Sequence, residues 1–267
     1  MDNRIKIRLI DKTFSHCEFS NNPIPIVNKS KFIEWVREDS DNELVVYTDK
    51  CIKLINSTNS IAWLLEPEEV KAAGYRFVRE NSKKFSSVWT WDKVLLKTIP
   101  NTVFYPFGGC WIEPKDRILH KKTKLTSMIF SKKKKLPGHI LRHKIFDNFH
   151  EKINYFQKIK NKIEGLKDFM FHVVVECVKK DFYFSEKLID SFLTGTIPVY
   201  WGCPSICNFF NTDGMFIFND INELNQKLEM CTKETYYNKL PAVLENYELA
   251  KKYILAEDWI YNNILHK

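Results

Sequence analysis

Apolar residues along this chain gather in short runs that polar segments separate. Phe171 to Glu176 and Thr196 to Trp201 are two such runs, and their length and apolar content are typical of buried strands. Between them, Ser185 to Thr194 repeats apolar residues at three- and four-residue spacing, with Ser185 in the position of an N-cap and Gly195 after the last turn. The order strand, helix, strand predicts a βαβ unit.

The rest of the chain alternates strands and helices in the same way. In the amino-terminal half the pattern predicts strands at Ile5–Ile10, Leu44–Tyr47, Ile61–Leu65, Ser87–Trp91 and Thr102–Tyr105, and helices at Phe32–Arg37 and Pro67–Glu80. In the other half it predicts strands at Leu125–Phe130 and Met215–Phe218, and helices at Gly138–Lys152 and over most of Tyr236–His266. This alternation predicts an α/β fold with parallel sheets.

A polar and basic stretch from Trp111 to Lys124, which contains Pro114, divides the two halves. The chain length of 267 residues suits two domains of modest size or one large one. We predict an amino-terminal α/β domain over residues 1–120 and a carboxy-terminal one over residues 121–267, with the last helix packing back on the first domain. Two Rossmann-like domains that face a cleft are the expected architecture.

Composition narrows the compartment and the kinds of site. No stretch approaches the roughly 20 apolar residues of a membrane span, and the charged start MDNRIKIRLID is unlike a signal peptide. A soluble, cytoplasmic protein is therefore expected. The seven cysteines are scattered without a CxxC spacing, which favours neither a disulfide framework nor a zinc site.

The net charge of +8 is unevenly placed, since Lys115 to Lys167 holds sixteen Lys or Arg against four Asp or Glu. Lys132 to Lys135 is most simply a solvated loop between a strand and a helix. Its functional interpretations are attraction of a nucleotide diphosphate, of an anionic lipid surface or of nucleic acid. No helix-turn-helix, zinc or RNA-binding signature accompanies the charge, so a nucleic-acid partner is not expected.

Polar residues of the predicted βαβ unit lie where open parallel sheets bind ligands, beyond the carboxyl end of the first strand. Ser185, Glu186 and Lys187 open the helix there. Backbone N–H groups of a helix start, together with Lys187, would hold a diphosphate, and Glu186 would accept from both hydroxyls of a ribose. An ordinary amphipathic helix with a solvated Glu-Lys pair is the alternative.

The segment YFSEKLIDSFLTGTIPVYWGCP resembles the donor-binding segment of the α1,3-fucosyltransferases, glycosyltransferase family 10, which is usually written as Tyr-x-Thr-Glu-Lys followed by Gly-Thr-x-Pro-Val-Tyr. The resemblance is strongest from Phe171 to Pro204. Weaker similarity covers AWLLEP, where the family carries its proposed catalytic glutamate, and KLTSMIFSKKKKLPGHILRHKIFDNF, where it delivers an arginine to the diphosphate. These positions are Glu66 and Arg142.

The resemblance implies a GT-B fold and an inverting transferase that moves fucose from GDP-fucose to a hydroxyl of a glycan acceptor. It implies Glu66 as the catalytic base, which would otherwise be a helix-start acid that complements the helix dipole. The implied donor-binding residues are Arg142, Glu176, Cys177, Tyr183, Ser185, Glu186 and Lys187. Arg142 could instead be a surface residue of the basic run. His139, His143 and His172 are expected to be structural or exposed and not ligands.

The chain departs from the family at Glu176, Cys177 and Val178, where the family commonly has Glu-Asn-Ser. An amide that could contact the sugar is therefore missing, and Ser185 replaces Thr. A different nucleotide sugar, or a catalytically silent homologue that binds a nucleotide or a glycan, stays open.

A metal cofactor is not expected, because Arg142, Lys187 and a helix start can share the charge that Mg²⁺ would otherwise neutralise. Asp39 and Asp41 form an Asp-Ser-Asp in the polar stretch EDSDNE, which is unlike the strand-end Asp-x-Asp of metal-dependent glycosyltransferases. The expected partners are a nucleotide-sugar donor and a glycan or glycoconjugate, with peripheral membrane contact open through Lys115 to Lys167. For the tryptophans at 89, 91, 111 and 201, core packing is the commoner use.

Overall fold

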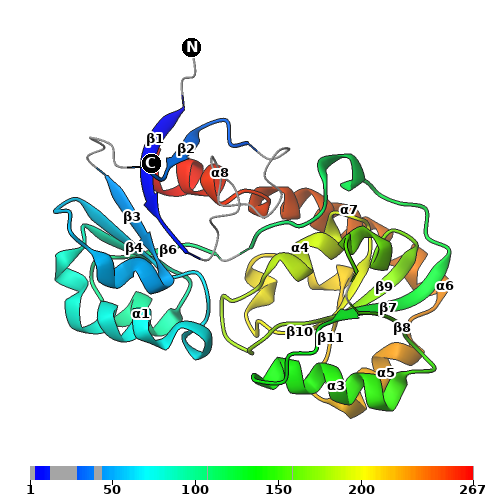
Figure 1. Ribbon diagram of the computed structural model, residues 1–267. Coiled ribbons are helices and arrows are strands. Elements are labelled where there is room, and N and C mark those ends of the chain that lie inside the picture. Colours follow the sequence, from blue (N-terminus) through cyan, green and yellow to red (C-terminus); the bar gives the residue numbers. More distant parts are fainter. Residues whose placement is uncertain (1–3, 13–28, 39–43, 107, 158, 267) are drawn as a thin grey trace. The chain divides into compact units, whose positions relative to one another are not determined.

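The computed structural model describes residues 4–12, 29–38, 44–106, 108–157 and 159–266. The chain divides into two compact units, one formed by residues up to Gly109 together with Leu255 onward, the other by Cys110–Ile254 (Figure 1). The division falls before residue 110 and not at residue 120. Cys110 and Ile112 are buried in the core of the second unit, and the Trp111 backbone N–H donates to Asp190 Oδ1 over 2.7 Å.

The first unit contains a six-stranded parallel sheet in the order β2-β1-β3-β4-β5-β6. Its strands are β1 (Ile5–Ile10), β2 (Ile33–Val36), β3 (Val45–Thr48), β4 (Ser60–Trp63), β5 (Ser87–Thr90) and β6 (Thr102–Phe104). Helices α1 (Glu68–Asn81) and α2 (Lys93–Thr98) contribute to the hydrophobic core on one face. Helix α8 (Ala256–Ile260), from the end of the chain, contributes to the other.

One prediction in this unit is wrong: Phe32–Arg37 is not a helix. Ile33 to Val36 form the edge strand β2, which pairs in parallel with β1. Ile33 and Trp35 are buried while their neighbours are partly exposed, so the period of two governs this stretch. The indole N–H of Trp35 donates to Glu257 Oε1 over 2.8 Å, which ties the strand to α8.

The second unit contains a five-stranded parallel sheet in the order β11-β10-β9-β7-β8. Its strands are β7 (Lys124–Phe130), β8 (Asn154–Gln157), β9 (Phe169–Val175), β10 (Ile197–Trp201) and β11 (Phe216–Ile217). Its helices are α3 (Pro137–Phe149), α4 (Glu186–Phe192), α5 (Ile221–Glu229), α6 (Lys233–Asn238) and α7 (Leu240–Ala250). The predicted βαβ unit is confirmed as β9-α4-β10, with Val173 opposite Val199.

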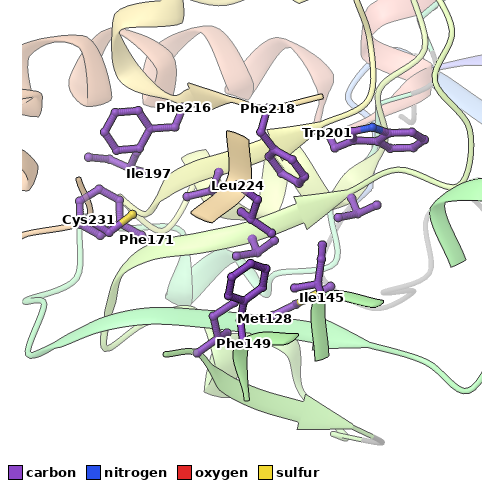
Figure 2. Close-up of a cluster of buried hydrophobic side chains, with 14 of the residues drawn as sticks. Met128, Ile145, Phe149, Phe171, Ile197, Trp201, Phe216, Phe218, Leu224 and Cys231 are labelled. Carbon is purple, nitrogen blue, oxygen red and sulfur yellow. The ribbon is translucent and has the colours of Figure 1, made fainter. Parts of the chain in front are cut away.

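Helices cover both faces of this second sheet. On one face α3 and α5 pack over the strands, and Figure 2 shows their Ile145, Phe149 and Leu224 against Phe171 and Ile197 of the sheet. On the other face α4 packs into a second apolar cluster, and Figure 1 shows it on the side opposite α3. Because both faces are covered, β9 and β10 are buried along their whole length.

Short 3-10 helices complete the described chain: η1 (Asp49–Leu54), η2 (Ser82–Lys84), η3 (Pro114–Asp116), η4 (Lys162–Gly165), η5 (Ile206–Asn208), η6 (Thr212–Gly214) and η7 (Lys251–Tyr253), with a π-helical turn at Tyr261–Leu265. Among the helices described, none has the length and apolar character needed to span a membrane.

A buried lysine holds the amino-terminal ends of β9 and β10. The Lys122 Nζ donates to the carbonyl oxygens of Leu166 and Thr194 over 3.1 and 2.8 Å, and to Thr196 Oγ1 over 2.7 Å. The Lys167 carbonyl lies 3.2 Å away as a further acceptor. One side chain thus satisfies the buried oxygens that precede both strands of the βαβ unit.

Replacing Lys122 by Met should lower the free energy of unfolding by about 2–4 kcal/mol, because buried acceptors lose their donor. Urea unfolding followed by circular dichroism measures this loss. The adjacent, exposed Lys121 is the matched control, and Lys121→Met should change stability by less than about 0.5 kcal/mol. Equal effects of the two substitutions would show that Lys122 has no such role.

Candidate active site

The carboxylate of Glu176 connects the end of β9 to the start of α4. Its Oε1 accepts the backbone N–H of Ser185 over 2.8 Å, and its Oε2 accepts the Ser185 hydroxyl over 2.6 Å. The Glu176 N–H donates in turn to the carbonyl of Trp201, at the end of β10. Glu176, which the sequence predicted as a binding residue, is fully buried, and both of its carboxylate oxygens bind Ser185. It therefore supports the start of the helix that carries Glu186 and Lys187.

Ser185 is the N-cap of α4, as predicted, and its Oγ accepts the backbone N–H of Lys187. The Lys187 ammonium also donates to this oxygen, over 2.9 Å. Helix α4 has only seven residues. A short helix with a capped first turn contributes little partial charge, so the ammonium of Lys187 dominates the attraction of an anion here.

Lys187 lies among carboxylates. Its Nζ is 3.3 Å from Glu186 Oε1 and 3.6 Å from Glu176 Oε2. Burial alone would lower the pKa of Lys187, but the carboxylates of Glu186 and Glu176 outweigh burial and raise that pKa above its ordinary value. The side chain stays partly exposed, so a permanently charged ammonium remains accessible to a ligand.

Lys162, which the sequence analysis did not single out, completes this charge cluster. Its Nζ donates to Glu186 Oε1 over 3.1 Å and to Asp190 Oδ2 over 3.2 Å. It also lies over the ring of Trp111, 4.7 Å from the centroid, and Trp111 is 45% exposed. No local pattern announces Lys162, because its partners follow it by 24 and 28 residues.

Glu186 is held in the ionised form by two cations. Burial favours its neutral form, yet Lys162 and Lys187 outweigh burial and lower the pKa of Glu186 far below its usual range. For Asp190 burial dominates, so its pKa is raised although Lys162 binds it. An ionised, partly exposed Glu186 is a strong acceptor for ligand hydroxyls.

Arg142 reaches the same region from α3. Its Nε donates to the Val175 carbonyl over 3.0 Å, a second guanidinium nitrogen donates to the same oxygen, and the residue is 7% exposed. Burial lowers the pKa of Arg142, while the Glu176 carboxylate opposes this. Its positive charge also acts on Lys187, so the structure brings together two cations that the sequence placed 45 residues apart.

Close backbone packing allows α3 to approach the end of β9. The Gly138 N–H donates to the Cys177 carbonyl over 3.0 Å, and a Cβ at this glycine would overlap the carbonyl oxygen of Glu176. Only glycine therefore permits this approach.

Cys177 and Tyr183 form a buried pair in the loop between β9 and α4, with Sγ and the hydroxyl 3.2 Å apart. The adjacent Phe182 has a φ of 63°, in the left-handed region that larger residues rarely adopt, and its N–H donates to Ser205 Oγ. The structure thus places both predicted binding residues inside the loop that precedes Ser185, where they hold its shape.

Glu66 belongs to the first unit and lies in the short connection between β4, which ends at Trp63, and α1, which begins at Glu68. Its backbone N–H donates to Asp49 Oδ1 over 3.4 Å, and its carbonyl accepts from the Tyr75 hydroxyl over 3.1 Å. The same Asp49 oxygen accepts the Leu65 N–H over 3.0 Å. Burial raises the pKa of Asp49 to about 7, the Leu65 hydrogen bond opposes the rise, and nearby Glu66 adds to it. Sequence reasoning missed Asp49.

The remaining candidates separate into core and surface residues. Trp89, Trp91 and Trp201 are buried, as expected for core packing, whereas Trp111 is exposed. His172 is buried against Ser127 Oγ, so its structural role is confirmed. Lys132 to Lys135 are exposed. Asp39 and Asp41 lie outside the described residues, and within those described no group of three or more His, Cys, Asp or Glu could hold a metal ion.

The chain was compared with known proteins by sequence and by structure. No family model matches the chain. Over 71 residues, 27% of the chain, it is 32% identical to the α1,3-fucosyltransferase FucT of Helicobacter pylori, and the match spans 15% of that protein. The resemblance to the α1,3-fucosyltransferases is thus confirmed over a segment.

Solved structures extend the likeness to the fold. An α1,3-fucosyltransferase with GDP-fucose has a TM-score of 0.57 at 15% identity, over 89% of this chain and 81% of that one. Alr3699/HepE of Anabaena, in complex with UDP and glucose, has a TM-score of 0.61 at 11% identity, over 98% and 100%. The chain therefore has the α/β fold of GT-B glycosyltransferases, with two parallel sheets.

Replacing Lys162 by Met should lower the free energy of unfolding by about 3 kcal/mol, because buried Asp190 loses its counter-charge. Thermal or urea unfolding measures the change. Lys160 is exposed and two residues away, so Lys160→Met is the matched control and should be nearly neutral. A Lys162 variant as stable as that control would contradict the ion-pair assignment.

Proposed function

We propose that this protein is a glycosyltransferase that takes its sugar from a nucleoside diphosphate sugar, with GDP-fucose as the donor. The observation that carries the proposal is the convergence of Arg142, Lys187 and ionised Glu186 at the carboxyl ends of β9 and β10. This is where open parallel sheets bind nucleotides. The segment is also the one that resembles the fucosyltransferases, and the similar enzyme in the solved structure holds GDP-fucose.

In this proposal the two cations receive the leaving group. When the bond between the anomeric carbon and the phosphate oxygen breaks, its electron pair remains on the diphosphate, whose negative charge increases. Arg142 and Lys187 stabilise this charge through hydrogen bonds from fixed positions. Because both cations stay charged at neutral pH, transfer proceeds without a divalent metal.

Glu186 binds the ribose. Among the described residues, both of its cationic partners contact Oε1, which leaves Oε2 for the hydroxyls of the nucleoside. A carboxylate accepts hydrogen bonds from neighbouring hydroxyls and has none to donate, so it selects a diol. Lys162 and Lys187 keep Glu186 in the form that this contact needs.

Glu66 is the catalytic base. It removes the proton from a hydroxyl of the glycan acceptor as that oxygen attacks the anomeric carbon from the side opposite the diphosphate, so the configuration inverts. Support comes from its position after a strand of a parallel sheet and from the hydrogen bonds of Asp49 and Tyr75 that fix its backbone.

The second candidate is a transferase for another nucleotide sugar. Cys177 favours this second candidate, because its thiol is hydrogen-bonded to the Tyr183 hydroxyl and offers no amide group to the sugar. The similar Anabaena structure holds UDP and glucose, so this fold accommodates a nucleotide other than GDP.

Calorimetry in EDTA should show that the protein binds GDP more tightly than UDP, CDP or ADP. Replacing Lys187 or Arg142 by Ala should weaken GDP binding roughly 10- to 100-fold, because a charged hydrogen bond contributes about 1.5–3 kcal/mol. Lys144→Ala, an exposed site on α3, is the control and should bind as wild type does. Preferential binding of UDP would favour the second candidate, and an absolute requirement for a divalent metal would contradict metal independence.

Replacing Glu66 by Gln should reduce transfer by about 10²- to 10⁴-fold and leave GDP affinity unchanged, because only the proton acceptor is lost. Release of GDP from GDP-fucose over a glycan library measures the rate. Glu69→Gln, at an exposed position of α1, is the matched control. Full activity in the Glu66 variant would exclude Glu66 as the base, and a wild-type protein that binds GDP-fucose without turnover would identify a silent homologue.

A further inference from the structure

His139 lies in the first turn of α3, next to the candidate diphosphate site, and is 9% exposed. Its Nδ1 accepts the backbone N–H of Leu136 over 3.3 Å. A nitrogen that accepts a hydrogen bond carries no proton, so the hydrogen of the neutral ring is on Nε2. Within the described part of the chain Nε2 has no hydrogen-bond partner. In the imidazole ring Nδ1 is therefore occupied as an acceptor, and Nε2–H is available as a donor.

The charged groups that face His139 are cationic. Arg142 and His143 lie on its own helix, Lys133 lies in the loop before it, and Lys187 comes from α4. Burial and, after it, Arg142, Lys133 and Lys187 lower the pKa of His139 to about 4. The carboxylates of Glu176 and Glu186 lie beside Lys187 and are hydrogen-bonded to Ser185 and to the lysines. A neutral N–H donor thus stands where positive potential from three elements overlaps.

Such an arrangement suits an anion. The first turn of a 13-residue helix carries partial positive charge, and α3 is long enough for this to matter. The nearly buried ring then adds a directed donor that the capping hydrogen bond keeps in one tautomer and orientation. The amino-acid pattern predicts a structural or exposed His139, but the capping contact accounts for only one of its two nitrogens.

We propose that His139 is a third anion-binding residue of the donor site, which donates Nε2–H to a phosphate oxygen of the nucleoside diphosphate while Nδ1 caps α3. The assignment rests on the proposed function and extends it from two phosphate-binding side chains to three. A neutral imidazole binds the phosphate by direction more than by charge, and so complements Arg142 and Lys187.

Two substitutions separate the two nitrogens. In His139→Asn the side-chain oxygen can replace Nδ1 as the helix cap, but no donor reaches the Nε2 position. In His139→Gln the amide nitrogen can replace the Nε2 donor, but the cap is lost. His150→Asn, at the other end of the same helix, is the control.

Calorimetry with GDP and with inorganic pyrophosphate tests the proposal, and thermal unfolding of each variant runs beside it. His139→Asn should lose roughly tenfold in affinity for both anions at near wild-type stability, because a hydrogen bond to a charged group is removed. His139→Gln should stay within about threefold of wild-type affinity while its melting temperature falls through loss of the cap. The ratio of wild-type to Asn-variant affinity should be constant from pH 6 to 8, since the ring is already neutral there.

The outcomes separate this inference from the proposed function. If wild type binds GDP and His139→Asn binds it equally well, the inference is overturned and the donor site stands. If the ratio of wild-type to Asn-variant affinity fell to one as the pH rises, the assignment of a neutral His139 as the donor would be overturned. If pyrophosphate binds in a His139-dependent manner but GDP does not, the anion site stands and the GDP assignment falls. Binding of neither anion would overturn both.

Discussion

The proposed donor region depends on one buried carboxylate, that of Glu176. A parallel strand ends in unpaired backbone groups, and the loop that follows must place the next helix at a defined distance and angle. Glu176 meets both needs, because its two oxygens bind the amide and the hydroxyl of Ser185 while its own amide is paired with β10. Without this link the cap of α4, and with it Glu186 and Lys187, has no fixed position relative to β9.

Charge in this region is balanced before any substrate arrives. The cations Arg142, Lys162 and Lys187 lie near the carboxylates of Glu176, Glu186 and Asp190, and each carboxylate is also held by a cation or a backbone donor. Burying unpaired charges would cost several kcal/mol each, so the balance lets a cationic surface exist in a folded protein. The carboxylates bind Ser185 and Lys162, which lie around Lys187, and the Lys187 side chain remains partly exposed.

The first unit solves a similar problem with a different group. Asp49 has a positive φ, is fully buried, and uses one oxygen to hold the amides of Leu65 and Glu66. Because burial raises the pKa of Asp49 to about 7, this carboxyl is only partly ionised at neutral pH. Glu176, by contrast, has the ammonium of Lys187 beside it. In both units a buried acid near a strand end positions a residue that the proposed function uses.

Short-range interactions decide four features that the amino-acid pattern predicts correctly: the β9-α4-β10 unit, the cap at Ser185, the helix after Pro67 and the position of Glu186 and Lys187 in a first turn. Hydrophobic period and capping chemistry act within a few residues, so a pattern reveals them. The prediction of a helix at Phe32–Arg37 was wrong, because four apolar and polar residues show too short a pattern to distinguish a strand from a helix. Pairing of Ile33 to Val36 with β1 makes this stretch a strand. Four features depend on the folded chain: Lys162 binds Glu186 and Asp190, Gly138 lets α3 approach Glu176, Cys110 begins the second unit, and Lys187 lies near enough to His139 to lower its pKa. These contacts join residues far apart in the chain, and their energy arises from burial and from charges that are neighbours only after folding.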